Sequence, residues 1–388
     1  METLLSIAIA LCAGLLVSRF VKPLKLPAVT GYLIAGILIG PYCLGKLGVQ
    51  GLGFPTNGDV KALSLFNDVA LGFIAFAIGN EFRLSALRQT GKQATVIGIV
   101  QALTATVLVD IALLLLHLAI PDKLSVPSAI TLGAIATATA PAATLMVVRQ
   151  YKAKGKLTDI LLPIVALDDA VGLVVFAVSF GVARAMVSGA FDMVSVIVEP
   201  LLEIVLSLGL GALLGAILTQ LEKLFNSNSN RLSLAIGFVV LTVALSLIKF
   251  EVFGVHIGFS SLLTCMMMGT IFCNLCILSG DLMEKCDRWT SPLFALFFVI
   301  SGAELELGVF SDIAIVGIGV VYILFRSLGK YLGAFSSAHI MKCDRNIVKY
   351  LGITLLPQAG VALGMAAEAA ELSDGHMVRN VVLFSVLV

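Results

Sequence analysis

The sequence predicts an all-α polytopic membrane protein with thirteen transmembrane helices, built from inverted repeats with two broken crossing helices. The first observation is composition: 59% of the 388 residues are hydrophobic, 13% are charged, and the mean hydropathy is +1.06. A soluble domain of this length could not bury that much apolar side chain. The other two observations are segments that match across the halves and prolines inside two apolar runs. A net charge of +1 gives no basis for nucleic-acid binding, so we expect a lipid bilayer as the surroundings and no nucleic-acid partner.

The thirteen spans are read from apolar runs of roughly 17–25 residues, the length that crosses a bilayer as a helix. We place them at residues 3–20, 27–45, 62–80, 93–119, 127–148, 159–183, 195–220, 232–248, 252–278, 290–309, 313–338, 348–370 and 377–388. The last run is too short to cross. We therefore expect the natural chain to continue past Val388, through the rest of this helix and towards a C-terminal cytosolic regulatory domain.

Positive charge sets the expected orientation in the cell membrane. Of the 25 Lys and Arg residues, 17 lie in loops after odd-numbered spans and six in loops after even-numbered spans. The remaining two are Arg326 and Lys330, inside a span. Because cytoplasmic loops are enriched in Lys and Arg, we expect the N-terminus to lie outside the cell.

Two pairs of segments are similar across the halves of the chain. FIAFAIGNEF at 73–82 resembles LFFVISGAEL at 296–305, and APAATLMVV at 140–148 resembles LPQAGVALG at 356–364. The members of each pair are seven spans apart, and an odd offset gives them opposite orientations. This arrangement is typical of an inverted-topology repeat.

Two prolines fall in the middle of matching spans. Pro141 and Pro357 each remove a backbone donor and clash with the preceding turn. They are flanked by polar side chains, namely Thr137, Thr139 and Gln358. Freed carbonyls at membrane depth must face protein or a water-filled cavity, so broken helices in matching positions indicate a transport site, with ordinary proline kinks as the plainer interpretation.

An aspartate pair is the chemical centre of the sequence. Asp168 and Asp169 lie within the apolar run LLPIVALDDAVGLVVFAVSF, residues 161–180. An ionised carboxylate there costs several kcal/mol unless it meets a cation, a proton or water. Two adjacent carboxylates also repel each other. The pair is therefore suited to holding a proton at one pH and a monovalent metal cation at another.

The charged residues of span 11 lie at a similar level. Counted from the cytosolic end at ~1.5 Å per residue, the aspartates are ~14 Å deep and Lys330 is ~12 Å deep. A Lys330–carboxylate pair is feasible, and one lysine neutralises only one carboxylate. Arg326 is one turn further out. We expect it to pair with Asp110 in span 4, unless Asp110 lies in a water crevice near the outer surface.

The motifs ALDDAVGLVVF, TATAPAATL, RSLGKYLG and LPQAGVALG together resemble those of monovalent cation:proton antiporters of the sodium/proton exchanger superfamily. The resemblance implies a homodimer, an elevator mechanism and two subdomains. Residues 1–80 and 232–309 would form the dimerisation domain. Residues 93–187 and 313–388 would form the core that translocates ions, and 193–223 would be the linker helix.

Individual roles follow from the same resemblance. Asp169 would be the site of the cation and the proton, and Asp168 the neighbouring acid that pairs with Lys330 in electrogenic members. Thr139 would help to coordinate the ion. The chain departs from the family at Ala140, where some members carry Asp or Ser. In addition, Arg326 resembles the arginine of the electroneutral branch.

The sequence therefore predicts secondary antiport of sodium, lithium or potassium against protons, with no enzymatic activity and no cofactor. One alternative is a potassium efflux system or cation channel on the same fold. A remote alternative from another class is an intramembrane aspartyl protease using Asp110 and Asp169. That enzyme usually needs a GxGD-like turn, which this sequence does not contain. Cavity size and ligand number, which decide sodium against potassium, are not readable from the sequence.

Overall fold

The architecture is helical almost throughout. The computed structural model describes residues 2–24, 28–49, 53–140, 144, 152–188, 199–248, 250–252, 255–305, 313–358, 360–372 and 374–387. Pro141 is outside the described residues, so only the second of the two predicted proline breaks can be followed through its proline.

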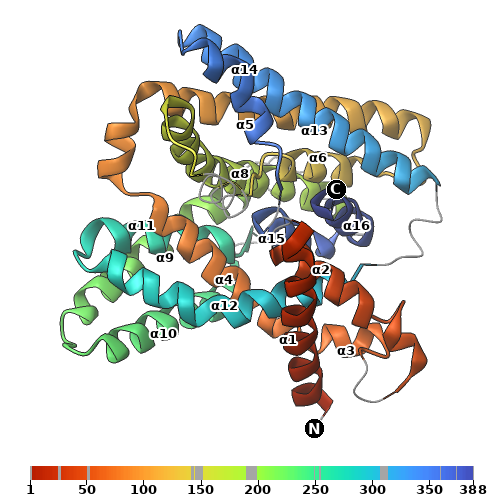
Figure 1. Ribbon diagram of the computed structural model, residues 1–388, viewed down its shortest axis with the longest axis horizontal. Helices are drawn as coiled ribbons and strands as arrows, with labels where there is room; N and C mark the ends of the chain where they lie inside the picture. The colour runs from red at the N-terminus through yellow and green to blue at the C-terminus, as the bar shows by residue number, and fades with distance from the viewer. Residues whose placement is uncertain are drawn as a thin grey trace.

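The elements are shown in Figure 1. The α-helices are α1 (Glu2–Val21), α2 (Ala28–Ile39), α3 (Asn57–Lys61), α4 (Ser64–Glu81), α5 (Leu84–Ala119), α6 (Val126–Ile135), α8 (Lys156–Ser188), α9 (Glu199–Glu222), α10 (Asn228–Ser246), α11 (Ser261–Leu275), α12 (Ser279–Ala303), α13 (Ile313–Ile340), α14 (Arg345–Thr354), α15 (Gly360–Glu368) and α16 (Gly375–Leu387). Short 3-10 helices are η1 (Lys22–Leu24), η2 (Leu44–Leu47) and η5 (Ala369–Glu371). One antiparallel pair of short strands joins β1 (Phe250–Val252) and β2 (Val255–Ile257).

Seven helices of the described chain are long and apolar enough to cross a membrane. They cover Leu4–Val21, Ala28–Leu47, Gly91–Ala119, Lys156–Val187, Leu201–Glu222, Asn228–Ser246 and Ile313–Ile340. Shorter apolar helices cover Ser64–Asn80, Val126–Ile135, Ser261–Leu275 and Gly375–Leu387. The all-helical membrane fold is therefore confirmed, whereas the total of thirteen spans stays a prediction.

The helices pack as two groups. In the first group, α2 packs against α1 and α12, and α11 packs against α4 and α9. In the second group, α5 packs against α6, α8 and α13, while α14 and α16 pack on α13. Figure 1 shows α5, α13 and α14 along one side of the molecule and α1, α10 and α12 towards the opposite side. Where the groups meet, Glu304 at the end of α12 forms an ion pair with Arg379 of α16.

Two interrupted helices lie in the second group. Helix α6 begins at the Ser125 N-cap, whose hydroxyl accepts a hydrogen bond from the Ser128 N–H, and ends after ten residues at Ile135. Ten residues rise ~15 Å, about half of the hydrocarbon thickness. Similarly, α14 ends at Thr354 and α15 begins at Gly360, which leaves a non-helical connection between two short helices. The predicted spans 127–148 and 348–370 are thus interrupted near their middles.

Small residues bring α5 and α13 into close contact. A Cβ on Gly329 would lie 2.6 Å from the Ala105 Cα, and one on Gly333 would lie 2.6 Å from the Gln101 Cα. Only glycine permits this backbone approach, which is common where membrane helices pack. Because Lys330 lies between these glycines, its side chain starts close to α5 and reaches the centre of the group.

The predicted span 252–278 is wrong at its beginning. Residues 250–252 and 255–257 pair as antiparallel strands, and the helix α11 begins only at Ser261. The segment FEVFGVHI alternates in polarity and is rich in aromatic and β-branched residues, a strand pattern rather than a helical one. Because the segment is also hydrophobic overall, apolar length alone does not distinguish it from the span that follows.

Candidate functional site

The two interrupted helices meet at their non-helical segments. The N–H of Ala140, which follows α6, donates to the carbonyl oxygen of Pro357 at 2.9 Å. This bond joins the first repeat to the second at the level where each helix is broken. A backbone donor and a backbone acceptor that lie outside any helix therefore satisfy each other, as an apolar environment requires.

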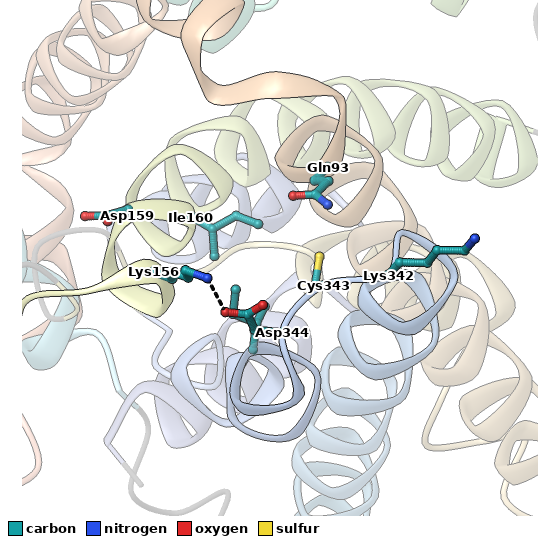
Figure 2. A pocket seen from close by; sticks show the side chains of 8 residues that line it. Gln93, Lys156, Asp159, Ile160, Lys342, Cys343 and Asp344 are labelled. Carbon is teal, nitrogen blue, oxygen red and sulfur yellow. Dashed lines mark ion pairs between the residues drawn. The ribbon is translucent and has the colours of Figure 1, made fainter.

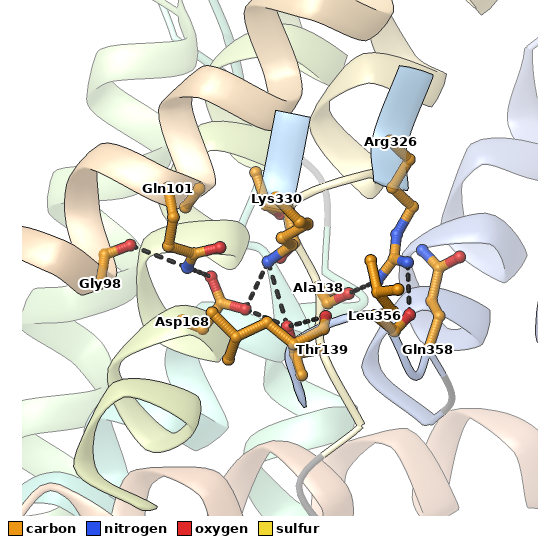
Figure 3. Close-up of polar contacts among 12 residues, drawn as sticks. Gly98, Gln101, Ala138, Thr139, Asp168, Arg326, Lys330, Leu356 and Gln358 are labelled. Carbon is orange, nitrogen blue, oxygen red and sulfur yellow. Dashed lines mark hydrogen bonds and ion pairs between the residues drawn. The ribbon is translucent and has the colours of Figure 1, made fainter. Parts of the chain in front are cut away.

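Arg326 binds both broken segments at once. Its Nη1 donates to the Leu356 carbonyl at 2.6 Å, and its Nη2 donates to the Ala138 carbonyl at 2.7 Å (Figure 3). The predicted pairing of Arg326 with Asp110 is therefore wrong. The planar guanidinium presents donors in a rigid fork, and the two freed carbonyls offer it better-placed acceptors than a carboxylate elsewhere on α5.

Asp168 is held by three side chains from three segments. Lys330 Nζ lies 2.6 Å from Oδ2, the Thr139 hydroxyl donates to the same oxygen, and the Gln101 amide donates to Oδ1 (Figure 3). Asp168 is fully buried, so each of these bonds replaces water that the carboxylate has lost. The structure thus places Thr139 beside Asp168 and Lys330, the two residues that the sequence leads us to expect as a pair.

Lys330 uses all three of its ammonium hydrogens. Besides Asp168, Nζ donates to the Thr137 carbonyl and, at 3.0 Å, to the Thr139 hydroxyl. The lysine is fully buried, and an ammonium group carries three donors and no acceptor. Asp168 compensates the charge of Lys330, and two neutral oxygens accept its other two hydrogens. All three acceptors lie more than a hundred residues away from Lys330 in the sequence.

Asp169 follows Asp168 on α8 and is also buried, with 1% of its surface exposed. Adjacent residues on a helix point ~100° apart, so the two carboxylates leave the helix in different directions. The centre therefore contains two buried acids, Asp168 and Asp169, and two buried bases, Lys330 and Arg326, of which Lys330 forms an ion pair with Asp168.

The remaining predicted residues contribute backbone or scaffold contacts. The Thr137 hydroxyl turns back to the Ala134 carbonyl, so that only its own carbonyl reaches Lys330. Gln358 donates to the Ile135 carbonyl and to the Tyr322 hydroxyl, and accepts from Ser385. Gln358 therefore ties its broken segment to α6, α13 and α16.

The sequence did not predict a role for Gln101. It lies in the middle of the apolar run 93–119 and is fully buried. An amide at that depth must find partners, and Gln101 donates to the Gly98 carbonyl as well as to Asp168. The signal was present as an isolated polar side chain within a span, but no charge or motif marked it.

A separate pocket of about 440 Å³ lies at the ends of α5 and α8 and at the turn between α13 and α14 (Figure 2). Its lining comprises Gln93, Lys156, Asp159, Ile160, Lys342, Cys343, Asp344 and Ile347. Lys156 and Asp344 form an ion pair of 2.8 Å there. Burial and the Asp344 carboxylate raise the pKa of the Cys343 thiol, so this pocket holds no reactive thiolate at neutral pH.

Replacing Arg326 by lysine is expected to lower the thermal stability of the detergent-solubilised protein. A lysine ammonium keeps the charge but cannot span the two carbonyls as a fork. The loss of one charged hydrogen bond corresponds to about 1.5–3 kcal/mol. The matched control is Arg288→Lys, because Arg288 is exposed on α12 and pairs with Glu284. Equal melting temperatures for the parent and Arg326→Lys would contradict the bridging role.

The fold and the site define a class of protein: a polytopic helical membrane transporter with a buried carboxylate–lysine centre between two broken helices. The family described as "Sodium/hydrogen exchanger, transmembrane" matches residues 7–388. The chain therefore belongs to the sodium/hydrogen exchanger family.

Individual relatives agree with this assignment. The chain is 27% identical to the Na(+)/H(+) antiporter NhaS4 of Synechocystis over 355 residues, covering 89% of this chain and 83% of that protein. It is 24% identical to Na(+)/H(+) antiporter 1 of Methanocaldococcus jannaschii, covering 88% of this chain and 79% of that protein. The structure of the sodium proton antiporter MjNhaP1 from the same archaeon has a TM-score of 0.75 at 18% identity, covering 100% of this chain and 95% of that chain.

Proposed function

We propose that the protein is a secondary antiporter that exchanges a monovalent cation for protons by alternating access. The observation that carries the proposal is a second buried acid, Asp169, next to an Asp168 whose two oxygens are both held by fixed donors, at the place where two broken helices meet. A carboxylate at membrane depth is suited to holding a proton and a cation in turn.

The bonding pattern supports a division of labour between the two acids. Both oxygens of Asp168 receive bonds from fixed donors, which suits a carboxylate that remains ionised and positions Lys330. We assign the exchange of proton and cation to Asp169. The Thr139 hydroxyl and the Thr137 carbonyl are neutral oxygens that accept from Lys330, and they are suited to complete a monovalent cation site when Lys330 moves.

The two groups of helices support a moving core and a fixed scaffold. We assign the core to the group of α5, α6, α8 and α13–α16, which contains the whole centre, and the scaffold and dimer interface to the group of α1, α2, α4 and α10–α12. Helix α9 would link them. In this arrangement the ion pair between Glu304 and Arg379 would have to open when the core moves. We further propose an external N-terminus, as the distribution of Lys and Arg indicates.

Competition between cation and proton tests the proposal. In proteoliposomes, the apparent KM for sodium is expected to rise as the proton concentration rises, because both ligands use the same carboxylate. The measurement is proton flux with a pH-sensitive dye while Na⁺, Li⁺ and K⁺ are varied, and protein-free liposomes are the control. A KM that stays constant over about two pH units, a hundredfold change in proton concentration, would exclude a shared site.

The same vesicles separate an antiporter from the alternative of a channel or efflux system. An antiporter moves cation only when protons move in the opposite direction. Cation efflux that continues at an unchanged rate, with no proton movement and no counter-gradient, would identify a conducting pathway instead. The sodium named in the relatives makes Na⁺ the first cation to test, and comparison with Li⁺ and K⁺ gives the selectivity.

A further inference from the structure

Asp110 is a further intramembrane carboxylate that lies apart from the centre formed by Asp168, Asp169 and Lys330. It lies in α5, and its Oδ1 is buried with no hydrogen-bond partner among the residues that the structure describes. The residue as a whole is partly exposed, whereas Oδ1 itself is covered. A negative charge on a covered oxygen without a donor is disfavoured relative to the protonated form. The antiport mechanism proposed above does not use this group.

The Asp110 carboxylate rests directly on the end of α6. A Cβ on Gly133 would lie 1.7 Å from Oδ1, and the three atoms nearest to that position all belong to the Asp110 carboxyl group. Gly133 is therefore the residue that makes room for this carboxylate, and a change in its charge or hydration acts on α6 at that point.

Gly133 is one helical turn before Thr137, where α6 has ended and the broken segment begins. The Thr137 carbonyl and the Thr139 hydroxyl accept from Lys330, and the Ala138 carbonyl accepts from Arg326. A displacement of the last turn of α6 would shift these oxygens relative to their donors. The geometry thus connects Asp110 to the ion centre through a short, continuous piece of backbone.

The charged side chains on the helices that pack against α5 bind partners other than Asp110. Helix α6 carries no titratable side chain. On α13, Arg326 binds carbonyls and Lys330 binds Asp168, while Arg184 near the end of α8 pairs with Glu203. Asp168 and Asp169, the remaining acids at depth on α8, belong to the ion centre.

Along α5 itself, His117 is two turns further out on a similar face. Its Nδ1 bonds to the Leu124 carbonyl at 2.6 Å, and because a carbonyl only accepts, Nδ1 is the donor. His117 is thus the nearest titratable side chain to Asp110 along α5 towards the C-terminal end of the helix.

We propose that Asp110 is a regulatory proton-binding site, distinct from the exchange site, that holds α6 in its working position when protonated. Loss of this proton at alkaline pH draws the carboxylate towards water and away from Gly133. The broken segment then shifts, and exchange slows. This proposal rests on the antiport function proposed above, and it adds a second pH dependence to the competition at Asp169.

The test is the pH profile of exchange at saturating sodium, measured for the parent and for Asp110→Asn. Asp122→Asn is the matched control, because Asp122 lies in the exposed loop after α5. His117→Gln distinguishes an effect of Asp110 from an effect of the histidine. Asparagine imitates the protonated acid. We expect the alkaline fall in rate to move upward by about one pH unit or more in Asp110→Asn, and to stay in place in Asp122→Asn and His117→Gln. A profile of Asp110→Asn that superimposes on the parent overturns the proposal, as does a shift produced equally by His117→Gln.

A double-mutant cycle tests the contact without relying on transport. Gly133→Ala is expected to lower the melting temperature of the detergent-solubilised parent, and to lower it much less in an Asp110→Ala background, where the new methyl group finds space. An equal loss in both backgrounds overturns the contact. On this proposal the folded form holds a proton at Asp110 that the unfolded chain releases, so the parent's melting temperature should also fall with rising pH more steeply than that of Asp110→Asn. If no variant, including the parent, exchanges cation for protons, the antiport proposal fails while these stability measurements still decide the Asp110 site.

Discussion

Asp169→Asn is expected to reduce cation-driven proton flux to the level of protein-free liposomes while the protein remains folded. Asparagine preserves the size of the side chain but removes the group that titrates, so neither a proton nor a cation can be bound with charge compensation. Asp168 stays in place with its bonds to Lys330, Thr139 and Gln101, which is why the fold should survive.

The measurement is dye-monitored flux in proteoliposomes, together with size-exclusion chromatography and a melting curve. Asp281→Asn is the matched control, because Asp281 is an exposed carboxylate that forms an i,i+4 pair with Lys285 on α12. A purified Asp169→Asn variant that exchanges near the parent rate would remove Asp169 from the mechanism. Loss of flux in the control as well would point to a defect in reconstitution.

Lys330→Gln is expected to retain exchange, to lower stability and to abolish the response to membrane potential. The substitution leaves the buried Asp168 without its counter-ion, and removing one partner of a buried pair typically costs about 3–5 kcal/mol. An amide also has fewer hydrogens than an ammonium, so the acceptors of Lys330 cannot all be satisfied. The effect on stability should exceed that of any other single substitution proposed for this centre.

The electrical effect follows from the same contacts. We propose that a cation which occupies Asp169 also draws on Asp168, so that Lys330 loses its partner and releases a proton. This second proton would make exchange electrogenic. Without Lys330, only the proton of Asp169 remains to be exchanged.

Imposing a potassium–valinomycin potential on proteoliposomes of the parent and of Lys330→Gln tests this mechanism. Lys285→Gln, in an exposed pair on α12, serves as the control and should respond like the parent. The mechanism fails if the parent ignores the potential or if Lys330→Gln responds to it as the parent does. An unchanged melting temperature for Lys330→Gln would contradict the structural role of the ion pair.

The pairing of Lys330 with a carboxylate could be anticipated because depth in a membrane helix depends only on sequence position and rise per residue. The crossing of two broken helices could be anticipated in the same way, since repeats and mid-span prolines are local patterns. The partner of Arg326 could not. It depends on which carbonyls two segments far apart in the sequence leave unsatisfied, and the fold places Ala138 and Leu356 within its reach.

The contact of Gln101 with Asp168 could not be predicted from the sequence either. As an isolated polar residue in an apolar run, it could be satisfied within its own helix or by a neighbour. The close approach of α5 and α13 at Gly329 and Gly333, together with the direction of α8, puts its amide against Asp168. The β-strand pair at 250–257 likewise depended on pairing rather than on hydrophobicity.

By itself, the sequence determined that this protein lies in a membrane, that two acids and a lysine share one depth, and that two helices break at matching places. Each of these properties can be read from a short stretch of sequence, because apolar length, charge and proline act on the segment that contains them. The tertiary structure alone decided that Gln101 and Thr139 also hold Asp168, that Arg326 binds two freed carbonyls, and that Asp110 rests on Gly133. Those outcomes depend on side-chain direction and on contacts between distant segments, which no local pattern specifies.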